Sequence, residues 1–263
     1  MATDTDQIHH SFQQDGFIGP LDIITPDEAY LSLTEVENEL SNDNASRFKL
    51  HLILPAISRI AHHPKLVEVV KAALNSQDIM LWSRTHYAPH QDCTYAVLTA
   101  WIALSNPVGE KEGCLSFYPG SHKLEQLPHL NEKDGDNLLV MGQYIGNDII
   151  ANLNKPKCIE LTAGQATLHS FDCVHASSPN RSEKPRVGLA LRYMTSNVRQ
   201  TKPVREMATW ICGEKSEHFD IEPRLPDNPS TDELERGKMA QNEGLAREES
   251  NYFNNHDGKG GVT

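Results

Sequence analysis

Short runs of β-branched and aromatic residues, separated by glycine, proline and asparagine, dominate the middle of this 263-residue sequence. The runs are Met80–Trp82, Ala96–Leu104, Cys114–Tyr118, Cys158–Leu161, Ala166–Phe171 and Val187–Met194. Each run has the length and composition of a strand, and the turn-forming residues between them mark the strand ends. Six or more short strands with such punctuation are typical of a barrel or a sandwich. The sequence therefore predicts a mainly β core.

Helical patterns precede this β region. Thr25-Pro26-Asp27-Glu28 has the capping residue, first-turn proline and early acids of a helix start, and the apolar spacing continues to about Leu40. Residues 51–74 carry apolar side chains three and four apart, with an interruption at His63-Pro64. Since the residue before a proline is disfavoured in a helix, this stretch predicts two short helices.

The length suits one large domain, and we expect the whole chain, 1–263, to form it. The expected parts are a helical N-terminal part (1–78) packed on the core, a β core (79–212) and a C-terminal appendage (213–263). Residues 122–156 are polar and punctuated by glycine, and a connection of that length is often a lid over a site. In the appendage, residues 231–249 have a helical pattern, and the polar end, 254–263, is expected to be mobile.

Charge and composition exclude several classes of partner. The formal net charge is −12 and no run of Lys and Arg exceeds two residues, which argues against nucleic acid. No stretch approaches the roughly 18 apolar residues of a membrane span, and the acidic start does not fit a secretory signal. We therefore expect a cytoplasmic protein without a membrane partner. Its oligomeric state is not predicted.

The cysteines are odd in number and lack CxxC spacing. They are Cys93, Cys114, Cys158, Cys173 and Cys212. This pattern indicates neither a disulfide framework nor a thiolate zinc site, so reduced thiols, mostly in the core, are expected.

Two His-x-Asp pairs occur among thirteen histidines, although about one such pair is expected by chance at this composition. In His90-Gln91-Asp92 the outer two residues lie between predicted strands, so their side chains share one face and can chelate one metal ion. His218-Phe219-Asp220 has only His256 downstream as a further ligand. We therefore expect His218 at the surface.

A third ligand for His90 and Asp92 must come from a distant strand, and the segment 168–179 offers His169 and His175. Two histidines and one carboxylate on one face of an octahedral ion leave three positions open, as in non-haem Fe(II) oxygenases. Zinc is more usually held by four ligands, or by three and a water. The residue types therefore favour iron and leave the third ligand open.

Several motifs follow one another in a fixed order between about Leu81 and Met194. They are His90-Gln91-Asp92, Ala100-Trp101, Tyr118-Pro119-Gly120-Ser121-His122 and His175-Ala176-Ser177-Ser178-Pro179-Asn180-Arg181-Ser182, with Arg186 eleven residues after His175. This order resembles the phytanoyl-CoA dioxygenase (PhyH) family of Fe(II)- and 2-oxoglutarate-dependent oxygenases. A weaker likeness extends to Asp15-Gly16-Phe17 and the early helices. The resemblance implies a mainly β fold with flanking helices around a double-stranded β-helix, a cupin-like jelly roll.

The resemblance also implies the metal ligands. His90, Asp92 and His175 would hold Fe(II), which selects His175 over His169 as the third ligand. We expect His169 to be a core residue or a neighbour of the ligands.

The co-substrate residues are implied in the same way. Arg186 would bind the far carboxylate of 2-oxoglutarate, and the fork of a guanidinium independently matches a carboxylate. Ser177, Gln91 and Trp101 match family positions that line the co-substrate, although Trp101 is almost equally well explained as a core aromatic.

The implied reaction converts 2-oxoglutarate and O₂ into succinate and CO₂ while it hydroxylates, or otherwise oxidises, an unactivated C–H bond. Asp92 favours a hydroxylase, because related halogenases have a small residue at that position. Two alternatives remain. One is a cupin-like metal-dependent hydrolase or isomerase without 2-oxoglutarate, which would have no use for Arg186. The other is a non-catalytic binding module on the same fold.

Departures from the family pattern lie near the expected substrate entrance. The segment Tyr95–Thr99 is short, and a lysine common upstream of the metal motif is missing, with Arg84 in its vicinity. Strand alternation puts Gly188, Ala190 and Arg192 on the face of Arg186, where the two small residues leave room. Arg192 and Arg84 are therefore the substrate candidates. We expect a small polar metabolite, and an anionic group would pair with Arg192.

Overall fold

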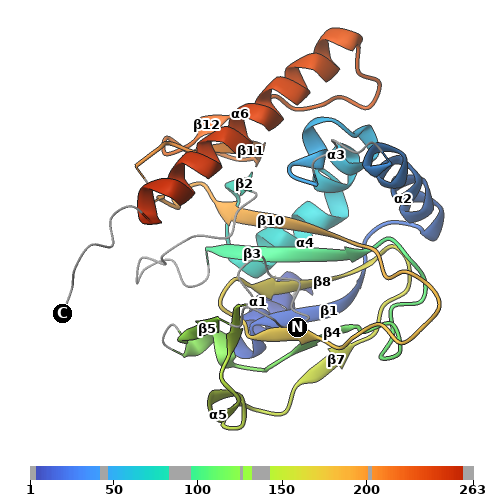
Figure 1. Ribbon diagram of the computed structural model, residues 1–263, viewed down its shortest axis with the longest axis vertical. Coiled ribbons are helices and arrows are strands. Elements are labelled where there is room, and N and C mark those ends of the chain that lie inside the picture. The colour runs from blue at the N-terminus through green and yellow to red at the C-terminus, as the bar shows by residue number, and fades with distance from the viewer. Residues whose placement is uncertain are drawn as a thin grey trace.

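The structure is a computed structural model that describes residues 4–41, 47–82, 96–124, 127–131, 143–200 and 203–256. The helices are α1 (Asp4–Asp15), α2 (Pro26–Leu40), η1 (Leu50–Leu52), α3 (Pro55–Ala61), α4 (Pro64–Leu74), η2 (Ser121–Lys123), α5 (Asn147–Ile150) and α6 (Thr231–His256). The strands are β1 (Phe17–Asp22), β2 (Ile79–Leu81), β3 (Val97–Ala103), β4 (Leu115–Phe117), β5 (His129–Asn131), β6 (Gln143–Ile145), β7 (Lys157–Ile159), β8 (Gln165–Ser170), β9 (His175–Ser177), β10 (Gly188–Thr195), β11 (Met207–Cys212) and β12 (Asp220–Ile221). Figure 1 shows the strands through the middle of the molecule and α6 across its top.

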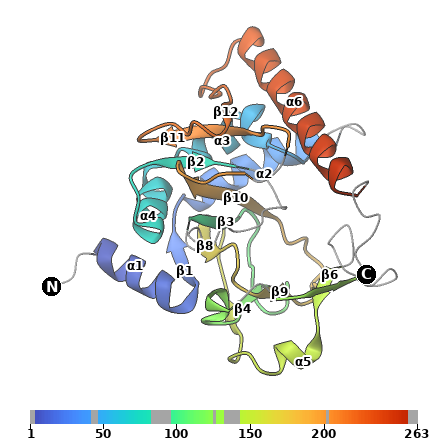
Figure 2. The same ribbon diagram turned by 90° about the vertical axis from the view of Figure 1, so that its left-hand side faces the viewer.

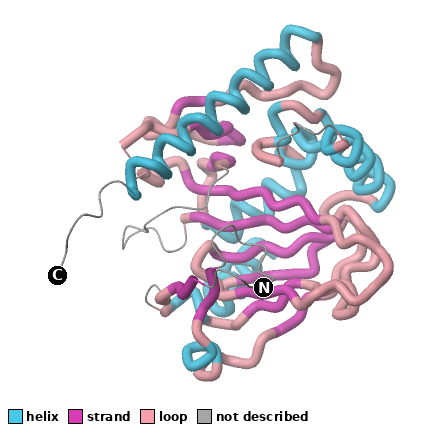
Figure 3. The backbone as a smooth tube through the Cα atoms, viewed as in Figure 1, coloured by secondary structure: helices cyan, strands magenta, loops and turns pink. Residues whose placement is uncertain are grey.

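A large and a small sheet form the centre of the fold. The large sheet has the order β1-β8-β3-β10-β2-β11-β12, and the small sheet has the order β7-β4-β9. Strands β5 and β6 form a separate hairpin. Helices and strands are distinguished by colour in Figure 3, where helices flank the stacked strands. The predicted mainly β, jelly-roll architecture with flanking helices is confirmed.

The two faces of the large sheet have different neighbours. One face packs against α1 and α4 in the main hydrophobic core, where Phe12, Leu66 and Val70 meet Leu98 and Leu191. The other face looks toward the small sheet, as Figure 2 shows with the large sheet seen nearly edge-on. Helices α1 and α4 thus cover one face of the large sheet, and the opposite face lines the space between the two sheets.

Strand β10 shows this division residue by residue. Leu191 and Tyr193 are buried in the main core, and Val187 and Leu189 pack against it. The predicted alternation is confirmed, because side chains two residues apart point to the same face of a strand. The residues between these four therefore face the small sheet.

The predicted helix boundaries are largely confirmed. Helix α2 begins with a full capping box, in which Thr25 and Glu28 exchange hydrogen bonds at 2.7–3.2 Å. His63-Pro64 separates α3 from α4. The C-terminal helix is longer than expected and reaches His256. The rest of the expected mobile end, 257–263, lies outside the described residues.

The N-terminal part is not purely helical, because β1 pairs antiparallel with β8 at the edge of the large sheet. Its sequence, Phe17-Ile18-Gly19-Pro20-Leu21-Asp22, has the glycine and proline of a turn. An edge strand tolerates a proline, and the register shifts between Ile18 and Leu21. Turn residues inside a short edge strand hid this element from the sequence pattern.

A buried ion cluster connects the C-terminal part to the segment before η1. The Lys49 ammonium contacts the Glu222 carboxylate and donates to Met207 O at 3.0 Å, and both charged side chains are at most 4% exposed. Thr209 Oγ1 donates to Glu222 Oε2 at 2.6 Å. Burial would raise the pKa of Glu222, but His51 and Lys49 outweigh it and lower that pKa to about 2.

The expectation of reduced cysteines is wrong for one pair. Cys114 and Cys158 form a disulfide, whereas Cys173 and Cys212 are free thiols. The pairing of β4 with β7 brings the two half-cystines together, with their Cα atoms 6.3 Å apart. Chain spacing alone could not show this, because 44 residues separate them. Cys93 lies outside the described residues.

The interval 122–156, which we expect to act as a lid, contains β5, β6 and α5, and its residues 125–126 and 132–142 lie outside the described part. Across the segments that the structure describes, no helix combines the length and the apolar character needed to cross a bilayer.

Candidate functional site

His175 begins β9, on the small sheet, and its ring has a fixed orientation. Its Nδ1 donates to Cys173 O at 2.8 Å, so Nε2 is the nitrogen available to another group. The side chain is exposed, yet surrounding protein atoms desolvate the ring and, with the charge of Arg192, lower the pKa of His175. A neutral imidazole with one oriented, accessible nitrogen is suited to bind a metal ion.

The turn that leads into β9 is held by Ser121 of η2. Ser121 Oγ donates to Tyr118 O at 2.7 Å and accepts from Val174 N at 2.9 Å. Tyr118 N in turn donates to Val174 O at 2.9 Å. The Tyr118–His122 motif thus contributes by fixing the residue before His175.

Aromatic rings fill the space between the two sheets beside His175. The Phe117 ring stacks on Phe17 with centroids 4.8 Å apart and lies 6.0 Å from the His175 ring. The His169 ring lies 4.7 Å from His175 and 5.1 Å from Phe117. His169 is 4% exposed, and burial holds its pKa well below the usual value. As expected, it is a buried neighbour of His175.

Arg186 reaches the same face of β9 as His175. Its Nη1 donates to Ser177 Oγ at 3.1 Å and to Gly113 O at 2.8 Å. Residues 175 and 177 are two apart on one strand, so their side chains share a face. A guanidinium has five N–H donors, and these two bonds use a single nitrogen. Partial burial lowers the pKa of Arg186, but an arginine remains charged.

The Arg186 guanidinium lies over the ring of Trp101. Arg186 Cζ lies 5.4 Å from the Trp101 ring centroid, close enough for a cation–π interaction. The ring also covers Gly188, where a Cβ would lie 2.0 Å from Trp101 Cζ2. Glycine at 188 therefore permits the tryptophan to lie flat against β10. Trp101 is half-buried and packs against two apolar clusters, as expected of a core aromatic.

Arg192 is aligned with His169 across three neighbouring strands of the large sheet. The register pairs Arg192 with Thr99 and Thr99 with His169, across β10, β3 and β8. Burial is the main cause of the lowered pKa values of His169 and His175, and the charge of Arg192 lowers both further. The expected grouping of Arg192 with Ala190 and Gly188 on this face agrees with the register.

The other predicted site residues, Arg84, His90, Gln91 and Asp92, lie outside the described residues. Trp82 and Ala96, which flank that segment, both bond to β10: Trp82 N donates to Arg192 O at 2.8 Å, and Thr195 N donates to Ala96 O at 3.0 Å. Both flanking residues therefore lie beside the strand that carries Arg192.

The second His-x-Asp pair has a structural role. Asp220 accepts from Arg205 at 2.8 Å and from Arg247 at 2.6 Å, which ties β12 to α6. Phe219 is buried, and His218, which we expect at the surface, is half-buried. A carboxylate engaged by two arginines is a poor metal ligand.

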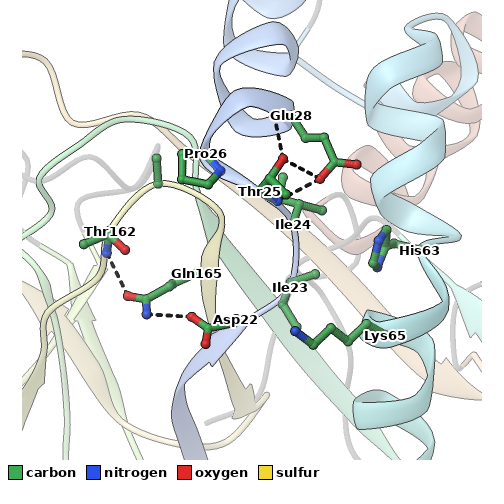
Figure 4. Close-up of a pocket in the computed structure, with 11 residues that line it drawn as sticks. Asp22, Ile23, Ile24, Thr25, Pro26, Glu28, His63, Lys65, Thr162 and Gln165 are labelled. Atoms are coloured by element: carbon green, nitrogen blue, oxygen red, sulfur yellow. Dashed lines mark hydrogen bonds between the residues drawn. The ribbon is translucent and has the colours of Figure 1, made fainter.

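A pocket of about 400 Å³ lies elsewhere, where β1 runs into α2. Its lining includes Asp22, Glu28, His63, Lys65 and Gln165, and Figure 4 shows the hydrogen bond from Gln165 to Asp22 beside it. Gln165 and His169 lie at opposite ends of β8, so this pocket is separate from the histidines and arginines above.

Three contributors to the site were missed by sequence reasoning: the carbonyls of Cys173 and Gly113, and the ring of Phe117. Backbone acceptors have no sequence signature. The glycine at 113 is a partial exception, because its φ of +77° favours glycine, but nothing in the sequence connects it to Arg186.

Comparisons with curated proteins give two relatives. The chain is 26% identical to an ectoine dioxygenase from Sphingopyxis alaskensis over 88% of this chain and 86% of that protein. It is 24% identical to a probable alpha-ketoglutarate-dependent hypophosphite dioxygenase from Stutzerimonas stutzeri, over 56% of each. The chain thus spans just over half the length of the second relative.

Solved structures show the same fold. The non-heme monooxygenase ThoJ, in its apo form, aligns with a TM-score of 0.72 and 24% identity over 94% of this chain and 99% of that one. CytC3 with Fe(II) and alpha-ketoglutarate aligns with a TM-score of 0.61 and 18% identity over 85% of this chain and 96% of that one.

The family comparison covers the region that carries the site. Residues 34–188 match the phytanoyl-CoA dioxygenase (PhyH) family, and this range spans more than half of the chain, from α2 to the start of β10. It includes His175 and Arg186, and also the His90-Gln91-Asp92 motif. The chain belongs to the phytanoyl-CoA dioxygenase family.

Proposed function

We propose that this chain is an Fe(II)- and 2-oxoglutarate-dependent dioxygenase that hydroxylates, or otherwise oxidises, an unactivated C–H bond of a small polar metabolite. One observation carries the proposal. His175 presents an oriented imidazole and Arg186 a half-buried guanidinium on the same face of β9, joined through Ser177. A metal-dependent hydrolase or isomerase without 2-oxoglutarate would have no use for that arginine.

The donor set fits a divalent iron. We propose that His90, Asp92 and His175 bind it, because two imidazoles and one carboxylate leave open positions for a chelating co-substrate and for O₂. The hydrogen bond to Cys173 O fixes the tautomer in which His175 Nε2 can bind metal. When bound, iron, 2-oxoglutarate and O₂ would supply the oxidising power, with succinate and CO₂ as co-products.

The chain's own residues would bind and position the co-substrate. We propose that Arg186 binds the far carboxylate of 2-oxoglutarate, with Ser177, Gln91 and Trp101 beside it. Trp101 keeps the guanidinium in place from below, and Ser177 and Gly113 hold one of its nitrogens. A cation that is already positioned and partly desolvated binds a carboxylate more strongly than a free surface arginine does.

The substrate is proposed to be a small polar metabolite, and an anionic group on it would pair with Arg192. On the β10 face the Trp101 ring fills the space over Gly188, and Ala190 is the remaining small residue. The strand register puts Arg192 in the same row as His169, whose ring lies 4.7 Å from that of His175. Arg84 is a second candidate for contact with the substrate. The curated relatives are named for hypophosphite and ectoine, both small and polar, which supports this class.

Succinate release tests the proposal. Purified protein with Fe(II), 2-oxoglutarate and O₂ is screened against a panel of small carboxylates, phosphonates and other polar metabolites. The expected result is substrate-dependent succinate formation that the variant His175→Ala lacks and the variant His218→Ala retains. His218 is a matched control, because it is a half-buried histidine outside the site.

A second measurement separates the reaction class from the alternatives. Anaerobic addition of Fe(II) and 2-oxoglutarate should give a weak visible charge-transfer band, which is absent in His175→Ala. Absence of the band in the unmodified protein would favour the hydrolase or isomerase alternative. A band without succinate release for any substrate would favour a binding module.

A further inference from the structure

The disulfide between Cys114 and Cys158 lies next to the group that holds the Arg186 side chain. It joins the residue before β4 to the middle of β7, 44 residues further along the chain. Cys114 directly follows Gly113, whose carbonyl accepts the 2.8 Å hydrogen bond from Arg186 Nη1. A single peptide unit separates the covalent cross-link from a contact of the guanidinium.

The turn that carries Gly113 is narrow and closely packed. Gly113 N donates to Glu110 O at 3.1 Å, and Cys114 N donates to Gly109 O at 2.9 Å. Gly113 has φ +77°, and a Cβ there would lie 2.1 Å from Ser178 O, just after β9. The turn therefore packs directly against the residue that follows Ser177 at the end of β9. A shift of this turn would move the Gly113 carbonyl relative to the guanidinium.

We propose that the Cys114–Cys158 disulfide is a positioning element for 2-oxoglutarate, and that its redox state sets the affinity for this co-substrate. The cross-link holds the Gly113 carbonyl in place, and through it Arg186. The inference rests on the proposed function, in which Arg186 binds the far carboxylate. The hydrogen bond from Arg186 to Ser177 does not involve the cross-linked turn. Opening the disulfide therefore weakens the anchor and does not remove it.

Opening the bond requires a reductant, which we take to be a dithiol. One thiolate of the dithiol attacks a cysteine sulfur, the S–S bond breaks, and the second thiol closes the reductant's own disulfide. Two electrons and two protons pass to the protein, which then carries two thiols. Cys158 is half-buried whereas Cys114 is 3% exposed, so the attack falls on Cys158.

The test measures the KM for 2-oxoglutarate in the full-length enzyme, both oxidised and reduced with dithiothreitol. Reduction is expected to raise this KM about 3- to 10-fold, as for one weakened hydrogen bond to a charged group, with kcat changed less than about 2-fold. The variant Cys158→Ser should have the raised KM and no response to dithiothreitol. Cys212→Ser, which removes a free thiol, should respond as the unmodified enzyme does.

Equilibrium binding gives a readout without turnover. At a fixed concentration of 2-oxoglutarate, the ligand-induced rise in Tm should be smaller for the reduced enzyme and for Cys158→Ser than for the oxidised enzyme. A disulfide that only stabilised the fold would lower the Tm without ligand and would leave this ligand-induced rise unchanged.

Three outcomes would overturn the proposal: equal KM values for the oxidised and reduced enzyme, a lower kcat with unchanged KM, or a non-reduced peptide map with free thiols at 114 and 158. If Cys158→Ser does not fold, the comparison of KM between the oxidised and the reduced unmodified enzyme still tests the proposal. A protein that shows no 2-oxoglutarate binding in any redox state would instead refute the proposed function.

Discussion

The substitution Gly188→Ala tests the packing beneath the proposed co-substrate anchor. A methyl group at 188 would lie 2.0, 2.3 and 2.6 Å from three atoms of the Trp101 ring. Carbon atoms in contact are about 3.5–4.0 Å apart, so the ring must retreat by roughly 1.5 Å. The backbone at 188 gives no other obstacle, since glycine in this strand has no left-handed φ. The whole effect therefore arises from the displaced indole.

Two consequences of that displacement can be measured. Overpacking of this kind destabilises a protein by about 1–3 kcal/mol, which lowers the Tm by about 2–10 °C for a chain of this size. Because Arg186 lies 5.4 Å above the ring centroid, its position changes as well. The KM for 2-oxoglutarate should rise about 10-fold, as for the loss of roughly 1.4 kcal/mol of binding free energy. Thermal unfolding and initial-rate kinetics measure the two effects.

A double-mutant cycle with Trp101→Phe identifies the cause. The smaller ring removes the atoms that the new methyl group would meet, so Gly188→Ala should destabilise this background by at least 1 kcal/mol less. Equal effects of Gly188→Ala in both backgrounds would refute the reasoning, as would an unchanged KM together with an unchanged Tm.

Three further predictions concern single groups. Glu222→Gln should destabilise the protein by about 3–5 kcal/mol at pH 7 in urea unfolding, because it leaves Lys49 buried without its counter-charge. Since the folded pKa of Glu222 is about 2 against an ordinary 4.5, its contribution is present above pH 4.5 and lost as the pH falls toward 2; the variant should lack this acid sensitivity. Tyr193→Phe should cost about 1–3 kcal/mol in the same assay, because the buried Ala61 carbonyl loses its 2.8 Å hydrogen bond. Arg186→Lys should raise the KM for 2-oxoglutarate at least about 10-fold despite the retained charge, because an ammonium cannot reproduce the fork; an unchanged KM would argue against Arg186 as the anchor.

The elements with strong local signals could be predicted from the sequence. The capping box at Thr25 and the break at His63-Pro64 mark α2, α3 and α4 correctly. Alternation in β10 separates the core side chains from those that face the small sheet. Both signals are local, because each depends only on residues that are close together in the sequence.

Short strands without an apolar pattern could not be found in this way. Strand β9 has three residues, His175, Ala176 and Ser177, and all three are exposed, so no apolar pattern marks it. It exists because β4 pairs with it and because Ser121 holds the turn before it. The position of His175 therefore depends on contacts distant in sequence, and only its motif indicated its importance.

The disulfide was missed for a related reason. The number and spacing of cysteines favour reduced thiols, but pairing is decided by which strands are neighbours. Arg186 shows the opposite case: its side-chain type and motif position singled it out, and the structure supplies the partners, Gly113 and Ser177, that no pattern could have named. Whether it binds 2-oxoglutarate stays a prediction for the kinetic tests above.

The bond between Cys114 and Cys158 turns everything from β4 to β7 into a covalently closed ring. A protease that cuts once inside this ring cannot release a fragment, because both new ends stay attached through sulfur. The same closure means that insertions or deletions between these two cysteines change the circumference of the ring but leave its two anchor points together. Insertions and deletions between the two cysteines can therefore be tolerated, because the disulfide still holds β4 beside β7.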